Sequence, residues 1–581
     1  MSVKQSTRTF LLLAGSVAAV MAAVGLVAVP SLLRARVQVT GAIPQTPPAT
    51  TSAMPVPFEP RVYELKQSPL RSVDSVVMLR GEADGVSGGV AGGVLGGVLG
   101  GTAKRNTEAY HRIVDNAFRA VVDSPLSTFS VDVDTASYAN VRRFLRGGQL
   151  PPKDAVRIEE LINYFHYDHP APEDDTPFAV RASVAECPWK PQHKLVLVGL
   201  QARRIDDGQV PPRNLVFLLD VSGSMASPNK LPLLKEAMGL LVDRLNEHDR
   251  ISIVVYAGAS GLVLPPTPGH RKGEIRAALG ALQAGGSTAG AAGIQLAYEV
   301  ARESFIEGGV NRVILATDGD FNVGVSSEGE LSRLIEEKRK TGVSLSVLGF
   351  GEGNLKDSTM EMLADKGNGN YSYVDSLAEA RKVLVTEAGS TLVMVAKDVK
   401  LQVEFNPATV SSYRLIGYEN RVLADADFND DARDAGDMGA GHSVTALYEV
   451  VPARAGTTVR AVDPLKYQEP RRVSAGASGD ELMTVKLRYK QPDGDTSRLL
   501  SVAVKDGPAA DSADIRFAAA VASFGMLLRD SEHKGSATFA TVLELARTGQ
   551  GDDPGGLRAE FVHLVESAQA LAAPRQARIG G

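Results

Sequence analysis

The residues best placed to do chemistry are a carboxylate and two hydroxyls at alternate positions of one short turn. Asp220, Ser222 and Ser224 directly follow an apolar run at residues 214–219, with Gly223 between the two serines. Alternate side chains of an extended turn point the same way, and glycine allows the backbone to bend tightly. Mg²⁺ prefers oxygen ligands in octahedral geometry. The pattern therefore predicts a site for Mg²⁺, with Mn²⁺ or Ca²⁺ as alternatives.

A series of alternating strands and helices must hold this turn in place. Apolar stretches predict strands at residues 214–219, 250–256, 312–317, 343–349 and 371–374. Helical spacing predicts helices at residues 231–246, 272–283, 289–305, 329–340, 358–365 and 377–387. This order indicates an α/β domain with a doubly wound parallel sheet. Because ligands bind beyond the carboxyl ends of such strands, we expect Asp220, Thr288 and Asp318 to meet at one edge.

Three short motifs contain these residues: Asp220-x-Ser222-x-Ser224, Thr288 in Gly-Gly-Ser-Thr-Ala-Gly, and Thr317-Asp318-Gly319. Together they resemble the metal-ion-dependent adhesion site of von Willebrand factor type A (vWA) domains. The resemblance implies a Rossmann-like fold. It also implies that the metal is bound directly by Asp220, Ser222, Ser224 and Thr288. Asp318 would act through a bound water.

Longer motifs extend the resemblance beyond the metal site. Residues 127–138, 316–324 and 413–421 resemble a subgroup of bacterial envelope proteins, the YfbK-like proteins. These proteins carry a vWA domain between an N-terminal extension and a C-terminal domain of unknown function. The resemblance spans residue 107 to the C-terminus.

The charge of the ligand set predicts binding and not catalysis. Two carboxylates and three neutral hydroxyls leave the cation poorly neutralised, so an open position can accept an Asp or Glu carboxylate from a protein partner. These loops lack the positioned general base that metal-assisted hydrolysis needs. We therefore expect a metal-dependent adhesion or assembly module, not an enzyme. The alternatives are an envelope scaffold subunit with a structural or regulatory metal, a metal-dependent hydrolase, or serines and aspartates that only cap turns and helices.

The N-terminus predicts where this module works. Residues 9–33 carry no charge and lie between basic residues, as in a membrane-spanning segment or a signal peptide. Residues 1–36 thus predict a cell-envelope protein, anchored in the inner membrane or exported to the periplasm after cleavage. The membrane is expected to contact this segment alone. Residues 37–106 are rich in Pro and Gly and are expected to form a disordered tether.

Two regions flank the vWA domain, which is predicted at residues 211–390. Residues 107–208 predict an α+β extension, residues 396–508 a β-rich domain and residues 511–575 a helical region. The alternating pattern of their strands is typical of antiparallel sheets. Each flank has few strands for a core of its own, so we hypothesise one β-sandwich with the α/β domain inserted. The expected strands lie at residues 127–133, 178–184, 194–200, 398–405, 446–451, 482–489 and 501–504, and the expected helices at 137–146, 154–164, 515–528, 540–547 and 557–571.

Composition narrows the functional classes further. The net charge is −6 and no basic stripe is present, which argues against nucleic-acid binding. The single cysteine, Cys187, excludes an intramolecular disulfide and is interpreted as part of a packed turn, with a reactive thiol as the alternative. Asp132 and Asp134 are interpreted as a strand edge before a helix. The acidic segment 427–434 is interpreted as a solvated loop, because it lacks the sixth-position glycine and twelfth-position carboxylate of a Ca²⁺ loop.

Overall fold

The computed structural model describes residues 106–579, apart from 132–133, 174–175, 206–208, 287–289, 320–327, 388–392, 434, 454–473, 475–476, 478 and 508–509. The predicted leader and almost all of the predicted tether lie outside the described residues, as do Asp132 and Thr288. Among the helices of the described part, none combines the length and apolar composition needed to cross a bilayer.

The α/β domain is built on a sheet whose strand order places the predicted turn at a switch point. The order is β10 (Tyr371–Val374), β9 (Ser344–Phe350), β8 (Val310–Thr317), β5 (Arg213–Asp220), β6 (Arg250–Tyr256) and β7 (Ser260–Pro268). All neighbours are parallel except β7, which pairs antiparallel with β6. The chain leaves β5 in one direction for β6 and later returns on its other side as β8. Ligands bind in the crevice beyond such a point.

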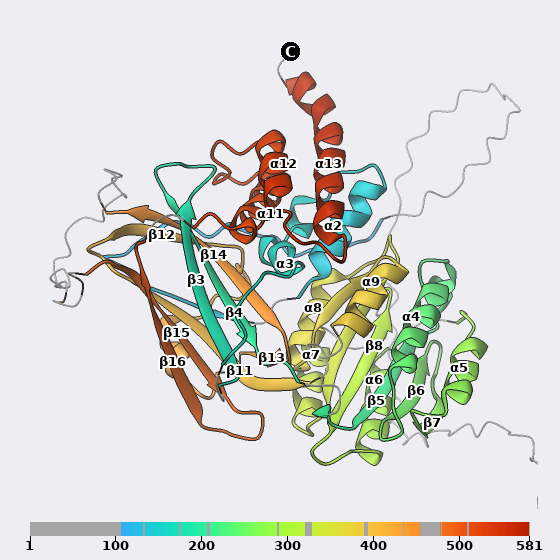
Figure 1. Cartoon of the computed structure of the whole chain (residues 1–581). Coiled ribbons are helices and arrows are strands. Elements are labelled where there is room, and N and C mark those ends of the chain that lie inside the picture. Colours follow the sequence, from blue (N-terminus) through green and yellow to red (C-terminus); the bar gives the residue numbers. More distant parts are fainter. Residues whose placement is uncertain are drawn as a thin grey trace, which may run out of the picture. The chain divides into compact units, whose positions relative to one another are not determined.

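Helices cover both faces of this sheet (Figure 1). One apolar core contains side chains of α4 (Leu231–Asp243), α5 (Lys272–Ala281) and α9 (Leu377–Arg381). A second core, on the other face, contains side chains of α6 (Gly290–Glu303), α7 (Glu328–Arg339) and α8 (Asp357–Lys366). The predicted doubly wound, Rossmann-like fold is confirmed. The prediction missed β7, because prolines at 265, 266 and 268 argue against a strand; they are tolerated at a sheet edge.

The two flanks form one antiparallel sandwich, as hypothesised. One sheet has the order β1 (Arg119–Ala120), β12 (Val410–Ile416), β14 (Ser443–Pro452), β4 (Lys194–Ala202) and β3 (Phe178–Glu186). The other has the order β13 (Gly436–Gly439), β11 (Met394–Phe405), β15 (Glu481–Lys490) and β16 (Ser497–Lys505), with β2 (Leu126–Ser130) also paired to β11. Each sheet thus takes strands from before and after the α/β domain. Apolar side chains of both sheets share one core.

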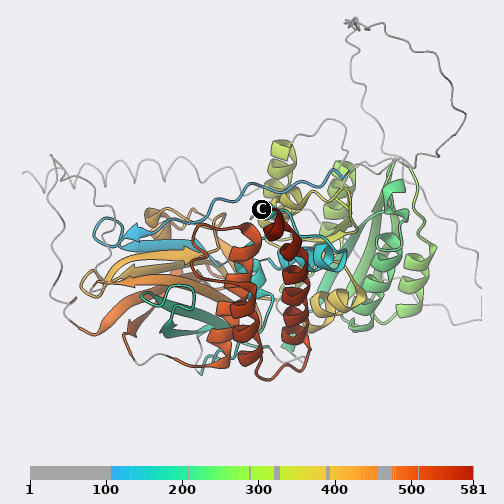
Figure 2. The ribbon, with the colours of Figure 1, turned by 90° about the horizontal axis from the view of Figure 1, so that it is seen from above.

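Helices from before and after the α/β domain also pack together in one layer. It comprises α2 (Ala136–Arg146), α3 (Ile158–Asn163), α11 (Ala513–Arg529), α12 (Phe539–Thr548) and α13 (Leu557–Ile579). Figure 2 shows the C-terminal helices, in red, beside the N-terminal ones, in cyan. Their shared core contains Phe165, Phe517 and Phe561 in edge-to-face contact. The prediction of one helix at residues 154–164 was wrong in its first half. A 3₁₀ turn at Lys153–Ala155 is followed by extended backbone at Arg157, and α3 begins at Ile158.

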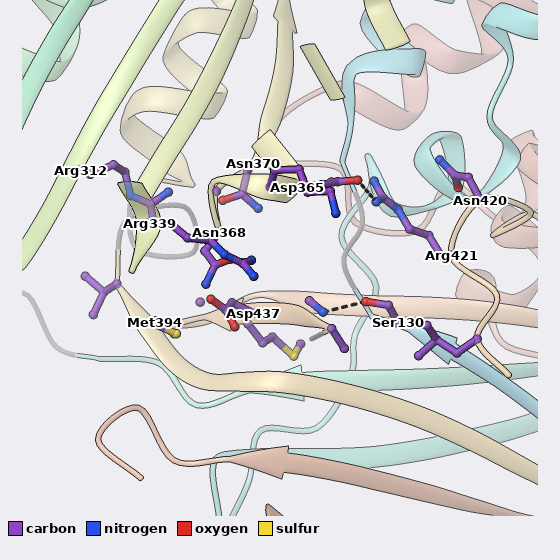
Figure 3. A pocket seen from close by; sticks show the side chains of 18 of the residues that line it. Ser130, Arg312, Arg339, Asp365, Asn368, Asn370, Met394, Asn420, Arg421 and Asp437 are labelled. Carbon is purple, nitrogen blue, oxygen red and sulfur yellow. Dashed lines mark hydrogen bonds and ion pairs between the residues drawn. The ribbon is translucent and has the colours of Figure 1, made fainter. Parts of the chain in front are cut away.

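The α/β domain meets the sandwich along a cleft of about 250 Å³ (Figure 3). Its walls come from the beginning of β8, the end of α7 and the loop between α8 and β10 on one side. The other side is formed by the beginning of β11, by β13 and by residues 420–423. This cleft lies at the end of the parallel sheet opposite to the predicted metal site.

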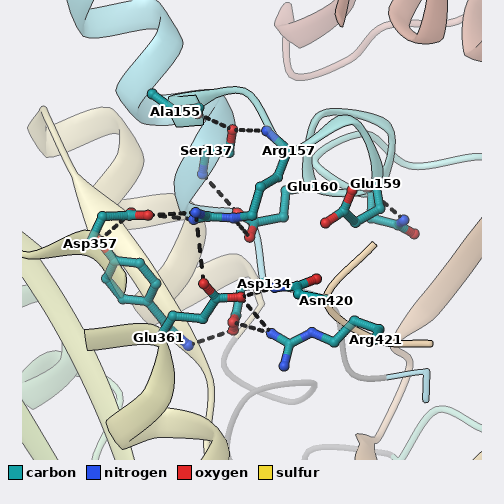
Figure 4. Close-up of polar contacts among 12 residues, drawn as sticks. Asp134, Ser137, Ala155, Arg157, Glu159, Glu160, Asp357, Glu361, Asn420 and Arg421 are labelled. Atoms are coloured by element: carbon teal, nitrogen blue, oxygen red, sulfur yellow. Dashed lines mark hydrogen bonds and ion pairs between the residues drawn. The ribbon is translucent and has the colours of Figure 1, made fainter. Parts of the chain in front are cut away.

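Beside this cleft, two buried arginines form ion pairs with carboxylates from several segments of the chain (Figure 4). Arg157 contacts Asp357 at 2.5 Å and also pairs with Glu160. Arg421 lies 3.1 Å from both Asp134 and Glu361. Carboxylate oxygens of Asp134, Glu160 and Glu361 fall within 4.8 Å of one another. The guanidinium groups of Arg157 and Arg421 already pair with these carboxylates. We therefore interpret the cluster as a network of buried ion pairs and not as a cation site.

Two minor predictions can be compared with the structure. Cys187 is fully buried in the core of the helical layer, and burial together with the charge of Glu449 raises the pKa of its thiol. The interpretation as a packed turn is confirmed. In the acidic segment, Asp431 is exposed and pairs with Arg488, while Met438 is buried in β13.

Candidate metal centre

The sheet brings the two predicted acidic residues to neighbouring strand ends. Asp220 is the last residue of β5, and Asp318 directly follows β8. The strands are parallel neighbours, with Leu219 opposite Ala316. Both carboxyl groups are fully buried. Their proximity follows from the strand order, as predicted.

The Asp220 carboxylate is fixed by hydrogen bonds on both oxygens. The backbone N–H of Ser222 donates to Oδ1 at 2.9 Å, and the Thr317 hydroxyl donates to Oδ2 at 3.1 Å. The Tyr256 hydroxyl lies 3.4 Å from the same Oδ2. Burial raises the pKa of the Asp220 carboxyl to about 6, against hydrogen bonds from Ser222, and the charge of Asp318 acts in the same direction as burial. Such an environment favours a cation that would compensate the buried charge.

The two serine hydroxyls lie side by side. Ser222 Oγ is 3.0 Å from Ser224 Oγ, close to the separation of about 2.9 Å between adjacent ligands of octahedral Mg²⁺. Ser222 is buried, whereas Gly223 and Ser224 are exposed at the surface. The donors therefore reach from a buried carboxylate to solvent, and this set of hard oxygens fits a small divalent cation.

Backbone hydrogen bonds connect this turn to the loop before Thr288. The N–H of Gly223 donates to the carbonyl of Gly286 at 3.1 Å, and the N–H of Gly285 donates to that of Val221 at 2.8 Å. Gly286 has a φ of +82°, in the left-handed region that glycine adopts without strain. Thr288 itself lies outside the described residues, so its predicted role as a ligand stays a prediction.

A lysine that the sequence analysis did not single out enters the same site. Lys230 precedes α4, is buried, and places its Nζ 2.8 Å from Asp318 Oδ2 and 2.9 Å from Asn354 Oδ1. Burial alone would raise the pKa of Asp318. Hydrogen bonds from Asn354 and Lys230, with the positive charge of Lys230, outweigh burial and hold that pKa below its ordinary value. The sequence carried no signal for this contact beyond a charged residue at the start of an apolar helix.

The first described residues of the chain border the loop that carries Asn354. The N–H of Thr107 donates to the carbonyl of Gly353 at 2.8 Å, and the N–H of Ala109 donates to that of Leu355 at 3.0 Å. Between them, Glu108 accepts from the Gly353 N–H at 2.8 Å and pairs with Arg143 at 2.9 Å. The N-terminal flank thus supports the loop that positions Lys230.

Family models match almost the whole described chain. A model described as "von Willebrand factor" matches residues 104–197, "von Willebrand factor type A domain" matches 214–385, and "Uncharacterized protein YfbK, C-terminal" matches 390–571. The chain is 44% identical over 476 residues to "Uncharacterized protein YfbK" of Escherichia coli K12, covering 81% of this chain and 82% of that protein. The chain belongs to the YfbK family.

More distant matches concern smaller parts of this YfbK-family chain. "Uncharacterized protein sll0103" of Synechocystis is 29% identical over 184 residues, covering 32% of this chain and 42% of that protein. A solved structure titled "von Willebrand factor type A from Catenulispora acidiphila" is 17% identical, covers 66% of this chain and 89% of its own, and has a TM-score of 0.39. The family model at residues 214–385 makes the central α/β domain a vWA domain, a type of protein-interaction module.

Proposed function

We propose that this protein is a metal-dependent protein-binding module tethered in the bacterial cell envelope. In this proposal Asp220, Ser222, Ser224 and Thr288 hold Mg²⁺, and Asp318 acts through a bound water. When bound, the metal supplies an electrophilic position for an Asp or Glu carboxylate of a protein partner. The supporting observation is that buried Asp220 and Asp318 meet beside the exposed Ser224 at the switch point of a vWA sheet.

The chain's own side chains give this site its charge balance. Asp220 is held by the Ser222 N–H and the Thr317 hydroxyl, so its carboxylate is oriented before a ligand arrives. Lys230 offsets the charge of Asp318, which leaves few negative charges to neutralise a divalent cation. A poorly neutralised cation at a solvent-exposed rim favours an added carboxylate. This is the chemistry of binding.

Binding is favoured over hydrolysis because both acids are already engaged. Asp318 is in an ion pair with Lys230, and both oxygens of Asp220 accept hydrogen bonds. Neither is positioned to take a proton from an attacking water. We therefore propose that the protein is not an enzyme.

The proposed location is based on the N-terminal sequence. The uncharged stretch at residues 9–33 would anchor the chain or direct its export, and the Pro- and Gly-rich residues 37–106 would act as a tether. Residues 107–109, where the described part starts, contact the loop carrying Asn354. The proposed tether would therefore end close to the metal centre.

A pull-down from solubilised envelope tests the function. The full-length protein, Asp220→Asn and the control Asp243→Asn, a half-exposed carboxylate paired with Arg276, are compared in Mg²⁺ and in EDTA. We expect a partner that is retained by wild type and Asp243→Asn in Mg²⁺ and lost in EDTA or with Asp220→Asn. The same partner retained in every condition would refute the adhesion role and favour a scaffold that binds through its flanks.

A further inference from the structure

Arg312 is a buried cation with few partners. It is the third residue of β8 and only 7% exposed. One terminal nitrogen donates to the Ser346 hydroxyl at 2.6 Å, and Nε has no hydrogen-bond partner among the described residues. Within the same described part of the chain, no carboxylate forms an ion pair with it. A buried charge without a counter-ion is unfavourable, so the surroundings of this guanidinium need an explanation.

The side chain lines the cleft of about 250 Å³ between the vWA domain and the sandwich. Arg339, Asn368 and Asn370 border the same space from α7 and from the loop between α8 and β10 (Figure 3). On the sandwich side, the polar lining residues include Asp437 and Arg421. Donor groups of several elements therefore surround one space, next to a guanidinium that lacks an anion.

The basic side chains that line this cleft differ in how far neighbouring carboxylates compensate their charge. Arg312, Arg339, Lys366 and Arg421 line it, against Asp365 and Asp437. Arg421 pairs with Asp134, Glu361 and Asp365, and Lys366 pairs with Glu336 at 2.8 Å. Asp437 acts on Arg312 through space, but burial outweighs it and lowers the pKa of the guanidinium to about 10. Unlike Arg421 and Lys366, Arg312 therefore has no carboxylate in direct contact among the described residues.

A second buried polar group without a hydrogen-bond partner among the described residues lies within range of the charge of Arg312. The hydroxyl of Tyr298 is fully buried and has no hydrogen-bond partner among the described residues. Burial raises its pKa, while the charges of Arg312 and Arg339 act against burial. The positive charges of Arg312 and Arg339 therefore both act on the buried hydroxyl of Tyr298.

We propose that this cleft binds a phosphate group, either inorganic phosphate or a small phosphate monoester, with Arg312 as its principal charge partner. A tetrahedral oxyanion accepts hydrogen bonds from several directions, as the guanidinium and amide groups here could supply, whereas one carboxylate is satisfied by a single guanidinium fork. The volume of about 250 Å³ leaves room for a phosphate and a few further atoms.

This site is independent of the proposed metal centre. Arg312 lies near the beginning of β8 and Asp318 directly after its end, a separation of about 20 Å at the rise of a β-strand. A ligand in the cleft would contact the vWA domain and the sandwich together. Phosphate should therefore stabilise the folded protein against heat.

Calorimetric titration and thermal unfolding of the purified full-length protein test the proposal. Wild type, Arg312→Met and the control Arg276→Met, an exposed arginine of α5 paired with Asp243, are titrated with inorganic phosphate at constant ionic strength. We expect one phosphate per wild-type or Arg276→Met chain and a raised Tm. Arg312→Met should bind at least about tenfold more weakly and show no rise in Tm.

Further variants and ligands identify the class of ligand and test whether Arg312 has only a structural role. Without phosphate, Arg312→Met should unfold at or above the wild-type Tm, because methionine removes an uncompensated buried charge. The side chain of Asn370 lines the cleft and makes no hydrogen bond among the described contacts. Asn370→Ala should therefore also weaken phosphate binding. Glycerol 3-phosphate binding more tightly than phosphate would identify a monoester site, and equal binding a phosphate site. Absence of phosphate binding, equal binding by Arg312→Met, or binding of succinate without competition by phosphate would overturn the proposal.

Discussion

Lys230 Nζ lies 2.8 Å from Asp318 Oδ2, inside the cluster of loops where we propose that a cation binds. Both groups are buried, so their attraction is only weakly screened by solvent. The lysine therefore competes with a divalent cation for the charge of Asp318. At the same time it protects a buried carboxylate when the cation is absent.

Replacing this lysine should strengthen metal binding. We expect Lys230→Met to bind Mn²⁺ about tenfold more tightly than wild type, because a positive charge close to the cation is removed. Its metal-free Tm should fall, since Asp318 loses its partner, and the rise in Tm on adding Mn²⁺ should be larger. Lys505→Met, the same charge change on an exposed strand, is the control. Unchanged or weaker Mn²⁺ binding by Lys230→Met in calorimetric titration would contradict the competition.

Thr317 is expected to position Asp220. Its hydroxyl donates to Asp220 Oδ2 and accepts from the Gly319 N–H at 3.1 Å. Thr317→Val keeps the shape but removes both contacts, at a cost of about 1 kcal/mol each in a buried site. The contact to Asp220 is the one that orients a proposed ligand, so its loss alone predicts roughly fivefold weaker Mn²⁺ binding, by the conversion of about 1.4 kcal/mol per factor of ten. Thr341→Val, which also removes one hydroxyl hydrogen bond but lies remote from the site, should bind as wild type does; an equal loss in both variants would argue for a general effect on stability.

The parts of this structure that the sequence predicted are those with local signals. β5 and β8 are buried on both faces and therefore read as continuous apolar runs. Asp220 and Asp318 are recognisable because the first ends β5 and the second directly follows β8. Strand β7 was missed because only its position at the sheet edge makes its prolines acceptable.

Contacts between distant segments could not be predicted in this way. The ion pair of Lys230 with Asp318 depends on how a loop places a long flexible side chain. Arg312 resembles any polar residue near the start of a strand, and its isolation arises because the sandwich covers that edge of the sheet. The shared sandwich was expected from the small number of strands in each flank. The order and pairing of its strands could be seen only in the structure.

The helical layer should couple the N-terminal and C-terminal flanks energetically. Phe561 of α13 lies 5.7 Å from Phe165 and 5.3 Å from both Phe517 and Phe524, between ring centroids. Phe561→Ala should lower the free energy of unfolding by about 3–5 kcal/mol, as measured by urea denaturation. His563→Ala, at an exposed position of the same helix, should change it by less than about 0.5 kcal/mol. A double-mutant cycle of Phe165→Ala and Phe561→Ala should show non-additivity of about 0.5 kcal/mol or more; strict additivity would mean that the two flanks do not pack against each other in solution.

Glu159 should make stability depend on pH. It is 3% exposed, its Oε2 has no hydrogen-bond partner among the described residues, and burial, followed by the charge of Glu419, raises its pKa from 4.5 to about 7. Because the folded pKa lies above the unfolded one, the stabilisation by the neutral form is complete below pH 4.5. It is lost as the pH rises to about 7, by roughly 3 kcal/mol at 1.36 kcal/mol per pKa unit.

The isosteric neutral variant isolates this effect. Glu159→Gln should match wild type near pH 4 and be the more stable protein near pH 8, with the difference developing between these values. Glu299→Gln, an exposed position of α6, removes the same charge and should show no such divergence. The measurement is the free energy of unfolding in urea across this pH range. A constant difference between Glu159→Gln and wild type would mean that Glu159 does not titrate in this range and is held ionised by Arg529, the cation that bridges Glu419 and Asp115 beside it.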